Sequence, residues 1–155
     1  MANWEIYRIS DVINEIDEGK YVLPVIQRSL VWTEEKMELL FDTLLKGDSF
    51  SGVIAIEEEK GKMPLFNYRR FSKTGELVNS KEIDKLEQTQ FFIIDGQQRL
   101  QTFYMGLMGS VNGKYLYFDL YSLGSILTIS TAVTSLCWES KIARDNPTYP
   151  VPTTT

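Results

Sequence analysis

One run of five residues, Asp95-Gly96-Gln97-Gln98-Arg99, carries the clearest chemical pattern in the chain. It follows the apolar residues 91–94 and opens the amphipathic segment 100–108, so the pattern predicts a strand, a tight turn and a helix. The first amides of a helix have no partner within the helix, and a turn of this kind can therefore hold an anion. Arg99 adds a planar cation suited to phosphate or carboxylate, and Asp95 adds a carboxylate that could hold Mg²⁺ or orient a water molecule.

Two interpretations of this turn remain open from the residues alone. In the functional interpretation, Gly96 allows a backbone conformation that a side chain would obstruct, and the amides of residues 96–98 face a phosphate. In the structural interpretation, Asp95 is the N-cap of the helix, and Gln98, three residues later, completes a capping box. A second polar cluster decides between them.

That second cluster consists of Gln27 and Arg28, followed by Trp32, in a segment without clear periodicity. Alone, it is typical of a surface loop in which the amide and the guanidinium are solvated and the indole packs beneath the next helix. If the loop instead faces the helix start at Gly96, the two clusters form one anion-sized pocket. A nucleotide site depends on this convergence.

The composition narrows the chemistry that the chain can perform. Its 155 residues contain no histidine, which removes Ser-His-Asp and Cys-His catalysis and histidine-ligated zinc. The formal net charge is -5, which argues against direct DNA binding, so DNA would be contacted through a partner. A single cysteine, Cys137, excludes an internal disulfide. With no signal peptide and no apolar run of ~18–20 residues, we expect a cytoplasmic protein without a membrane span.

The hydrophobic pattern predicts a small α+β domain, with a mixed sheet and packed helices. Strands are expected at residues 7–9, 21–23, 52–56, 65–71, 91–94 and 114–120. Helices are expected at residues 11–18 after a Ser10 cap, from Thr33 to Gly47, from the glutamine turn to about Met108 and, as a short element, at 81–87. The strand at 52–56 is rich in branched residues, which favours burial on both faces.

The character of the sequence changes near residue 122. From there on Ser and Thr become dense, and the last residues are rich in proline. We therefore expect one domain at 1–121, followed at 122–155 by a divergent Ser/Thr/Pro-rich tail or a truncated continuation.

Taken together, the two clusters resemble the N-terminal domain of GmrSD-type modification-dependent restriction enzymes. The resemblance covers roughly residues 5–121 and rests on four patterns: Pro24-x-x-Gln27-Arg28-x-x-x-Trp32, a Leu-rich helix ending at Gly47, a Gly-x-Ile-x-Ile strand, and Ile94-Asp95-Gly96-Gln97-Gln98-Arg99-Leu100-x-Thr102. The chain departs from the family pattern at Ile26, Leu30 and Gln101, where an aromatic, an aromatic and a threonine are common. The resemblance implies a ParB/sulfiredoxin-like fold.

The resemblance also implies a nucleoside-triphosphate-binding domain, in several members a nucleotide hydrolase, that controls a DNA-cleaving domain in anti-phage defence. Carried over by residue, the nucleotide-binding positions are Gln27, Arg28, Gly96 and Arg99, and the catalytic positions are Asp95, Gln97 and Gln98, with Asp95 also holding Mg²⁺. The implied partners are a nucleoside triphosphate, a nuclease domain or subunit, and DNA through that nuclease. Self-association is left open. The chain lacks histidine and is not expected to cut DNA itself. A rival hypothesis is a non-catalytic switch module that works through the nuclease.

Overall fold

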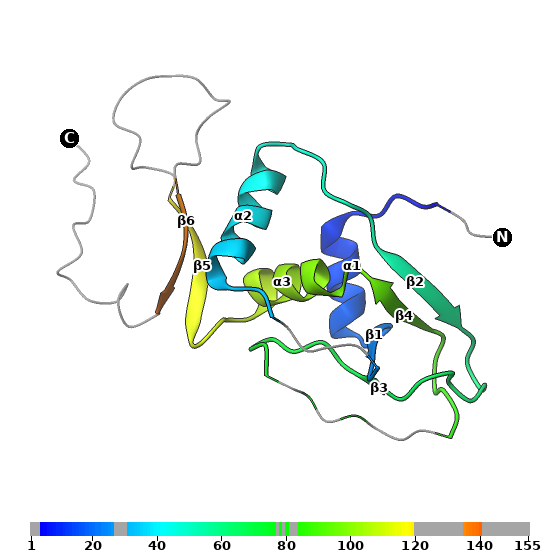
Figure 1. The fold of residues 1–155 in the computed structure, drawn as a ribbon. Helices are drawn as coiled ribbons and strands as arrows, with labels where there is room; N and C mark the ends of the chain where they lie inside the picture. The colour runs from blue at the N-terminus through cyan, green and yellow to red at the C-terminus, as the bar shows by residue number, and fades with distance from the viewer. Residues whose placement is uncertain are drawn as a thin grey trace, which may run out of the picture.

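The computed structural model describes residues 4–26, 31–76, 78, 80, 84–119 and 135–140. In chain order its elements are α1 (Ile9–Asp17), β1 (Tyr21–Pro24), α2 (Glu34–Leu45), β2 (Ile54–Glu58), β3 (Tyr68–Arg69), β4 (Gln90–Asp95), α3 (Gln97–Met108), β5 (Lys114–Asp119) and β6 (Ser135–Ser140). Figure 1 shows the three helices gathered beside the sheet, with β5 and β6 together at one end.

Four of the strands form a mixed sheet in the order β2-β4-β1-β3. The central pair, β4 and β1, is parallel, with Tyr21 opposite Phe91, and the two outer pairs are antiparallel. Strands β5 and β6 form a separate antiparallel pair. The predicted α+β class with a mixed sheet is confirmed.

The sheet has a buried core on each face, because successive strand residues point to opposite sides. Tyr21, Leu23 and Ile93 join the apolar side chains of all three helices on one face. On the other face Val22 and Phe92 are fully buried, and they pack with Tyr68 of β3 and with Leu86 from the irregular chain before β4. The helices thus cover one side of the sheet and a long connection covers the other.

Helix α3 is held from several directions, which fixes the turn at its start. The buried side chain of Gln101 donates to the main-chain carbonyl of Ser72 and accepts from the Ser72 N–H at 3.3 Å. The hydroxyl of Tyr104 donates to Asp17 at the end of α1 over 2.6 Å. Most of the helix surface is therefore committed to neighbouring segments.

Several sequence predictions are confirmed and others are wrong. The strands at 21–23 and 91–94 and the helix from Thr33 to Gly47 are confirmed to within a residue or two, and the helix expected to end at about Met108 is confirmed as α3. Residues 7–9 form no strand, because α1 begins at Ile9 with Arg8 as its N-cap, and Ser10 lies in the first turn. Of residues 65–71, only Tyr68–Arg69 form a strand.

The strand predicted at 52–56 lies in a different environment from the one expected. The exposed residues of β2 run from 54 to 57, so the prediction of burial on both faces is wrong. Among the described strands, β2 pairs only with β4 and forms an edge of the sheet. Branched residues suit an edge strand as well as a central one, since both need extended backbone.

The remaining expectations concern the second half of the chain. Residues 84–87 form no helix, and residues 81–83 of that predicted element lie outside the described residues. The predicted boundary near 122 also lies outside them; residues 135–140 form β6, whose six residues pair with β5 from Ser135↔Asp119 to Ser140↔Lys114. No helix in the described ranges is long and apolar enough to cross a membrane.

Candidate functional site

The turn between β4 and α3 is built on glycine. Gly96 is the N-cap of α3, with φ 85° and ψ 7°, a left-handed conformation that other residues adopt at a cost. A Cβ atom at this position would lie 2.9 Å from Cγ2 of Val53. The turn therefore requires glycine twice, once for its backbone angle and once for the approach of Val53.

The structural interpretation of this turn as a capping box is wrong. Asp95 is the last residue of β4 rather than the N-cap, and Gly96, which is the N-cap, makes no side-chain capping hydrogen bond. The helix thus begins one residue later than the capping box predicts.

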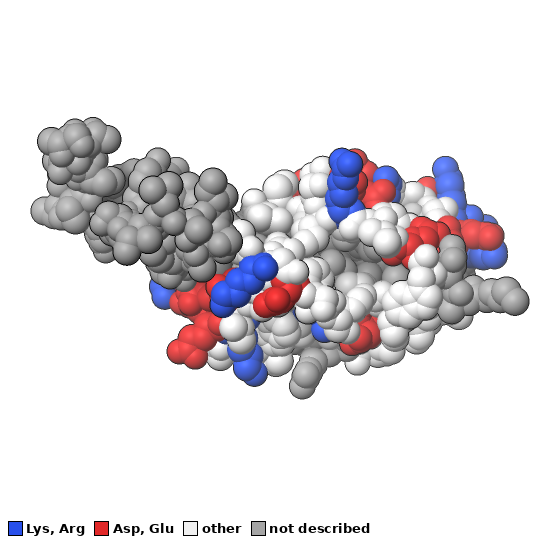
Figure 2. All heavy atoms as spheres, turned by 90° about the horizontal axis from the view of Figure 1, so that it is seen from above, with Lys and Arg blue, Asp and Glu red and all other residues white. Residues whose placement is uncertain are grey.

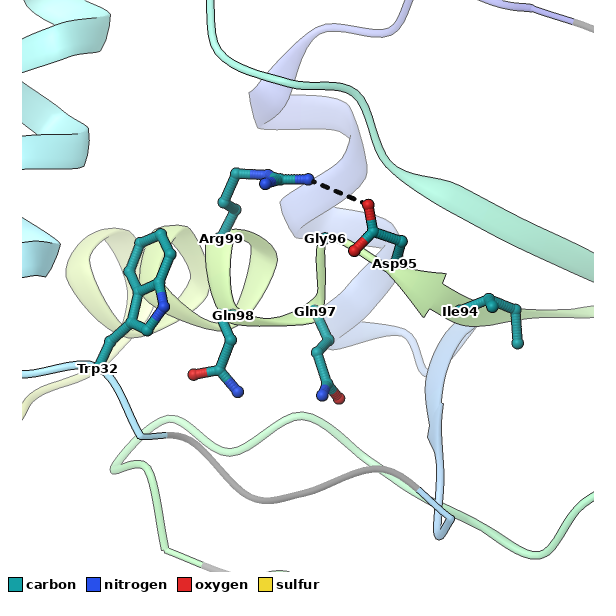
Figure 3. Close-up of a pocket in the computed structure, with 7 residues that line it drawn as sticks. All are labelled: Trp32, Ile94, Asp95, Gly96, Gln97, Gln98 and Arg99. Carbon is teal, nitrogen blue, oxygen red and sulfur yellow. Dashed lines mark ion pairs between the residues drawn. The ribbon is translucent and has the colours of Figure 1, made fainter.

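A hollow of about 370 Å³ surrounds this helix start (Figure 3) and is lined by Trp32, Ile94, Asp95, Gly96, Gln97, Gln98 and Arg99. Its volume lies near the lower end of the range for small-molecule sites. Figure 3 shows Gln97 and Gln98 on one side of α3, and Arg99 with Asp95 on the other. The hollow is therefore lined by amide groups and by a charged pair at different places around the helix start.

Arg99 ties the helix start to the chain before β2. Its Nη2 atom donates to the carbonyl oxygen of Gly52 at 2.6 Å and lies 3.6 Å from Oδ2 of Asp95. The Arg99 side chain is only 19% exposed, and its Nε atom is buried with no hydrogen-bond partner among the described residues. This arginine thus combines a structural contact with a place on the wall of the hollow. The sequence motif did not predict this contact with Gly52.

Gln98 joins the helix start to the segment of the second cluster. Its Oε1 atom accepts a hydrogen bond from the main-chain N–H of Val31 at 3.0 Å. The structure thereby brings Trp32, the next residue, to the hollow predicted from the first cluster. Gln27 and Arg28 lie outside the described residues, so their convergence on Gly96 stays a prediction.

Trp32 contacts both the hydrophobic core and the hollow. It is partly buried and packs against two apolar clusters, one around Phe41 and Phe103 and one around Met37 and Met105. The same residue lines the hollow. The expected packing of the indole near the second helix is confirmed, and the ring also contributes to the site.

The carboxylate among the lining residues is that of Asp95, which is 63% exposed. In the described part of the chain, no group of three or more His, Cys, Asp or Glu residues could hold a metal ion. Magnesium is commonly bound through one or two carboxylates together with the phosphates of a nucleotide. The lining thus offers one carboxylate, Asp95, that could be such a ligand, and the Mg²⁺ expected there stays a prediction.

The titratable groups behind α3 stabilise the helix that carries the motif. The hydrogen bond from Lys73, with a further one from Tyr104, lowers the pKa of Asp17. Burial, together with the hydrogen bond to Asp17, raises the pKa of Tyr104. Both groups therefore keep their hydrogen-bonding forms at neutral pH, and the link from α1 to α3 stays intact there.

Comparison with known proteins gives two findings. The family model of the GmrSD restriction endonuclease N-terminal domain matches residues 9–149, a range that extends beyond the boundary predicted near 122. An uncharacterised protein of Methanocaldococcus jannaschii is 30% identical over 97 residues, which are 63% of this chain and 16% of that protein. The match thus spans about a sixth of the length of that relative.

Proposed function

The chain belongs to the family of GmrSD restriction endonuclease N-terminal domains, and on that premise we propose that it is the nucleotide-binding regulatory domain of a restriction or phage-defence system. The observation that carries the proposal is the hollow at the start of α3. Its lining combines the first amides of a helix, a guanidinium, a carboxylate and an aromatic ring. These are the groups that recognise the phosphates, metal ion and base of a nucleotide.

In this proposal the phosphates lie against the amides of residues 96–98. The positive end of the α3 dipole favours their charge there. Arg99 neutralises phosphate charge from one wall, and it can do so while bonded to Gly52 because a guanidinium carries five N–H bonds. Gln27 and Arg28 approach from the facing segment. Magnesium held by Asp95 would supply further charge neutralisation.

Two outputs of nucleotide binding are proposed. In the first, Asp95, Gln97 and Gln98 orient a water molecule that attacks the terminal phosphorus, and the bond to the bridging oxygen breaks to release phosphate. In the second, the domain binds without hydrolysis and acts as a switch. The contact between Gln98 and Val31 favours the second, because a ligand at the helix start would act directly on the segment that this contact holds.

DNA is proposed to reach this domain through a partner nuclease. The chain has a formal net charge of -5 and no histidine for a histidine-based nuclease site. On the face shown in Figure 2, lysines and arginines are interspersed with acidic residues rather than gathered into a basic patch. Both features fit a sensor domain whose nuclease is another domain or subunit.

Calorimetric titration with each of the four nucleoside triphosphates and Mg²⁺ tests the binding step, and a phosphate-release assay tests the chemical step. Binding with release supports hydrolysis, and binding without release supports the switch. Gln97→Ala should weaken binding or release, whereas Leu39→Ala, at a 63% exposed position on α2 outside the lining, should leave both unchanged. If none of the four triphosphates binds at millimolar concentration, the proposal is wrong.

A further inference from the structure

We propose that Trp32 is the base-binding wall of the hollow, so that the base of a nucleotide stacks on its indole while the phosphates lie at the start of α3. This inference rests on the proposed nucleotide site and makes it more specific. It predicts a ligand that needs a base as well as a chain of phosphates. Among the residues lining the hollow, Trp32 is the aromatic one.

The indole is fixed in place before any ligand arrives. Its packing against the clusters around Phe41 and Met37 restricts the ring. The main chain just before it is anchored, because the Val31 N–H donates to Oε1 of Gln98 at 3.0 Å. A wall that is already ordered loses little conformational entropy on binding, so most of the stacking energy contributes to affinity.

The aromatic and the polar lining residues lie at opposite ends of the hollow, as the base and the phosphates do in a nucleotide. In Figure 3, Trp32 lies toward one end of the row of lining residues, and Gly96 and Asp95 lie toward the other, with Gln98 between. A ligand that spans this row meets an aromatic ring at one end and amides with a carboxylate at the other. Inorganic polyphosphate would contact only the end with the amides, whereas a nucleoside triphosphate would also contact the aromatic ring at the other end.

The Gln98 carboxamide acts in this arrangement as a positioning group. Since its Oε1 accepts from Val31, it sets where the indole lies relative to the helix start. Gln98→Leu should therefore weaken the contribution of the base and leave the phosphate contribution nearly unchanged. A role of Gln98 only in orienting water would instead lower phosphate release and leave nucleotide affinity unchanged.

The test compares ATP with inorganic tripolyphosphate, each with Mg²⁺, by calorimetry and by intrinsic fluorescence. The chain has three tryptophans, and replacing Trp4 and Trp138 by Phe leaves Trp32 as the only indole reporter. We expect ATP to quench this fluorescence and tripolyphosphate to bind without quenching it. This measurement keeps Trp32 intact, so it does not depend on whether a variant at that position folds.

Substitutions at Trp32 give the second arm of the test. Trp32→Leu should weaken ATP binding by about 5- to 150-fold, the loss that corresponds to one stacked base, and change tripolyphosphate binding less than two-fold. Trp32→Phe, which keeps an aromatic face, should restore most of the ATP affinity. If ATP binds without quenching, or if Trp32→Leu weakens both probes equally, the base wall is wrong while the nucleotide site stands. If the unmodified chain binds neither tripolyphosphate nor any of the four nucleoside triphosphates, both proposals are wrong.

Discussion

Substituting alanine for glycine at two helix boundaries, Gly47 and Gly96, separates backbone strain from close packing. Gly96 and Gly47 have similar φ values, 85° and 75°. A Cβ at Gly96 would meet Val53 Cγ2 at 2.9 Å and the Arg99 guanidinium at 3.1 Å, whereas a Cβ at Gly47 would meet nothing within 4 Å. Gly47→Ala should therefore cost only the left-handed backbone penalty, about 1 kcal/mol, and Gly96→Ala should cost about 2–3 kcal/mol.

Chemical denaturation and thermal unfolding measure this difference. For a chain of this size, each kcal/mol lowers the melting temperature by about 2–4 °C, so we expect a drop of ~2–4 °C for Gly47→Ala and ~4–12 °C for Gly96→Ala. In the Gly96→Ala background, Val53→Ala should recover part of the loss, because it removes the atom that the new methyl group meets. Equal destabilisation by the two alanines, with no recovery from Val53→Ala, would refute the close-packing argument.

Three further perturbations test the contacts that hold α3. Arg99→Met should cost about 1–2 kcal/mol of unfolding free energy, measured in urea, because it removes a charged hydrogen bond to Gly52 at a mostly buried site, and no loss would mean that the contact contributes nothing. The folded-state pKa of Asp17 is lowered below 3.8, so the stability it contributes is present above pH 4 and is lost as the pH falls through that lowered value. Asp17→Asn should therefore reduce the difference in urea midpoint between pH 7 and pH 3, and an unchanged difference would contradict the role of this carboxylate. Gln101→Leu should cost about 1–3 kcal/mol, since it removes both hydrogen bonds to the Ser72 main chain, whereas Gln97→Leu, with its more exposed side chain, should cost less in the same titration.

The sequence predicted best where a periodic pattern and a turn signal agree. Residues 91–108 contain an apolar run, then a glycine, then an amphipathic segment, and the structure has β4, the turn and α3 at these places. The edge position of β2 was not predictable, because the residues of an extended segment do not reveal how many neighbours it has. Whether β2 is an edge or a central strand depends on its pairing with β4, about 35 residues away in the chain.

The site was predicted in part for a similar reason. The residue types at 95–99 indicated an anion-binding turn, and the structure places them around one hollow. The partners of these side chains come from distant parts of the chain: Gly52 for Arg99, at a separation of 47 residues, and Val31 for Gln98, at a separation of 67. Gln101 stood out only as a departure from the family pattern, and its contact with Ser72 supplies a physical role for that departure.

The position of β2 at the margin of the sheet has a consequence for how the chain behaves in concentrated solution. Ile54 and Ile56 are exposed beside backbone groups that, within the described residues, no further strand engages. Such a margin is a template on which another extended peptide can assemble, and the exposed carboxylates of Glu57 and Glu59 oppose this by mutual repulsion between copies. Added salt weakens that repulsion, so colloidal stability should be greatest at low ionic strength.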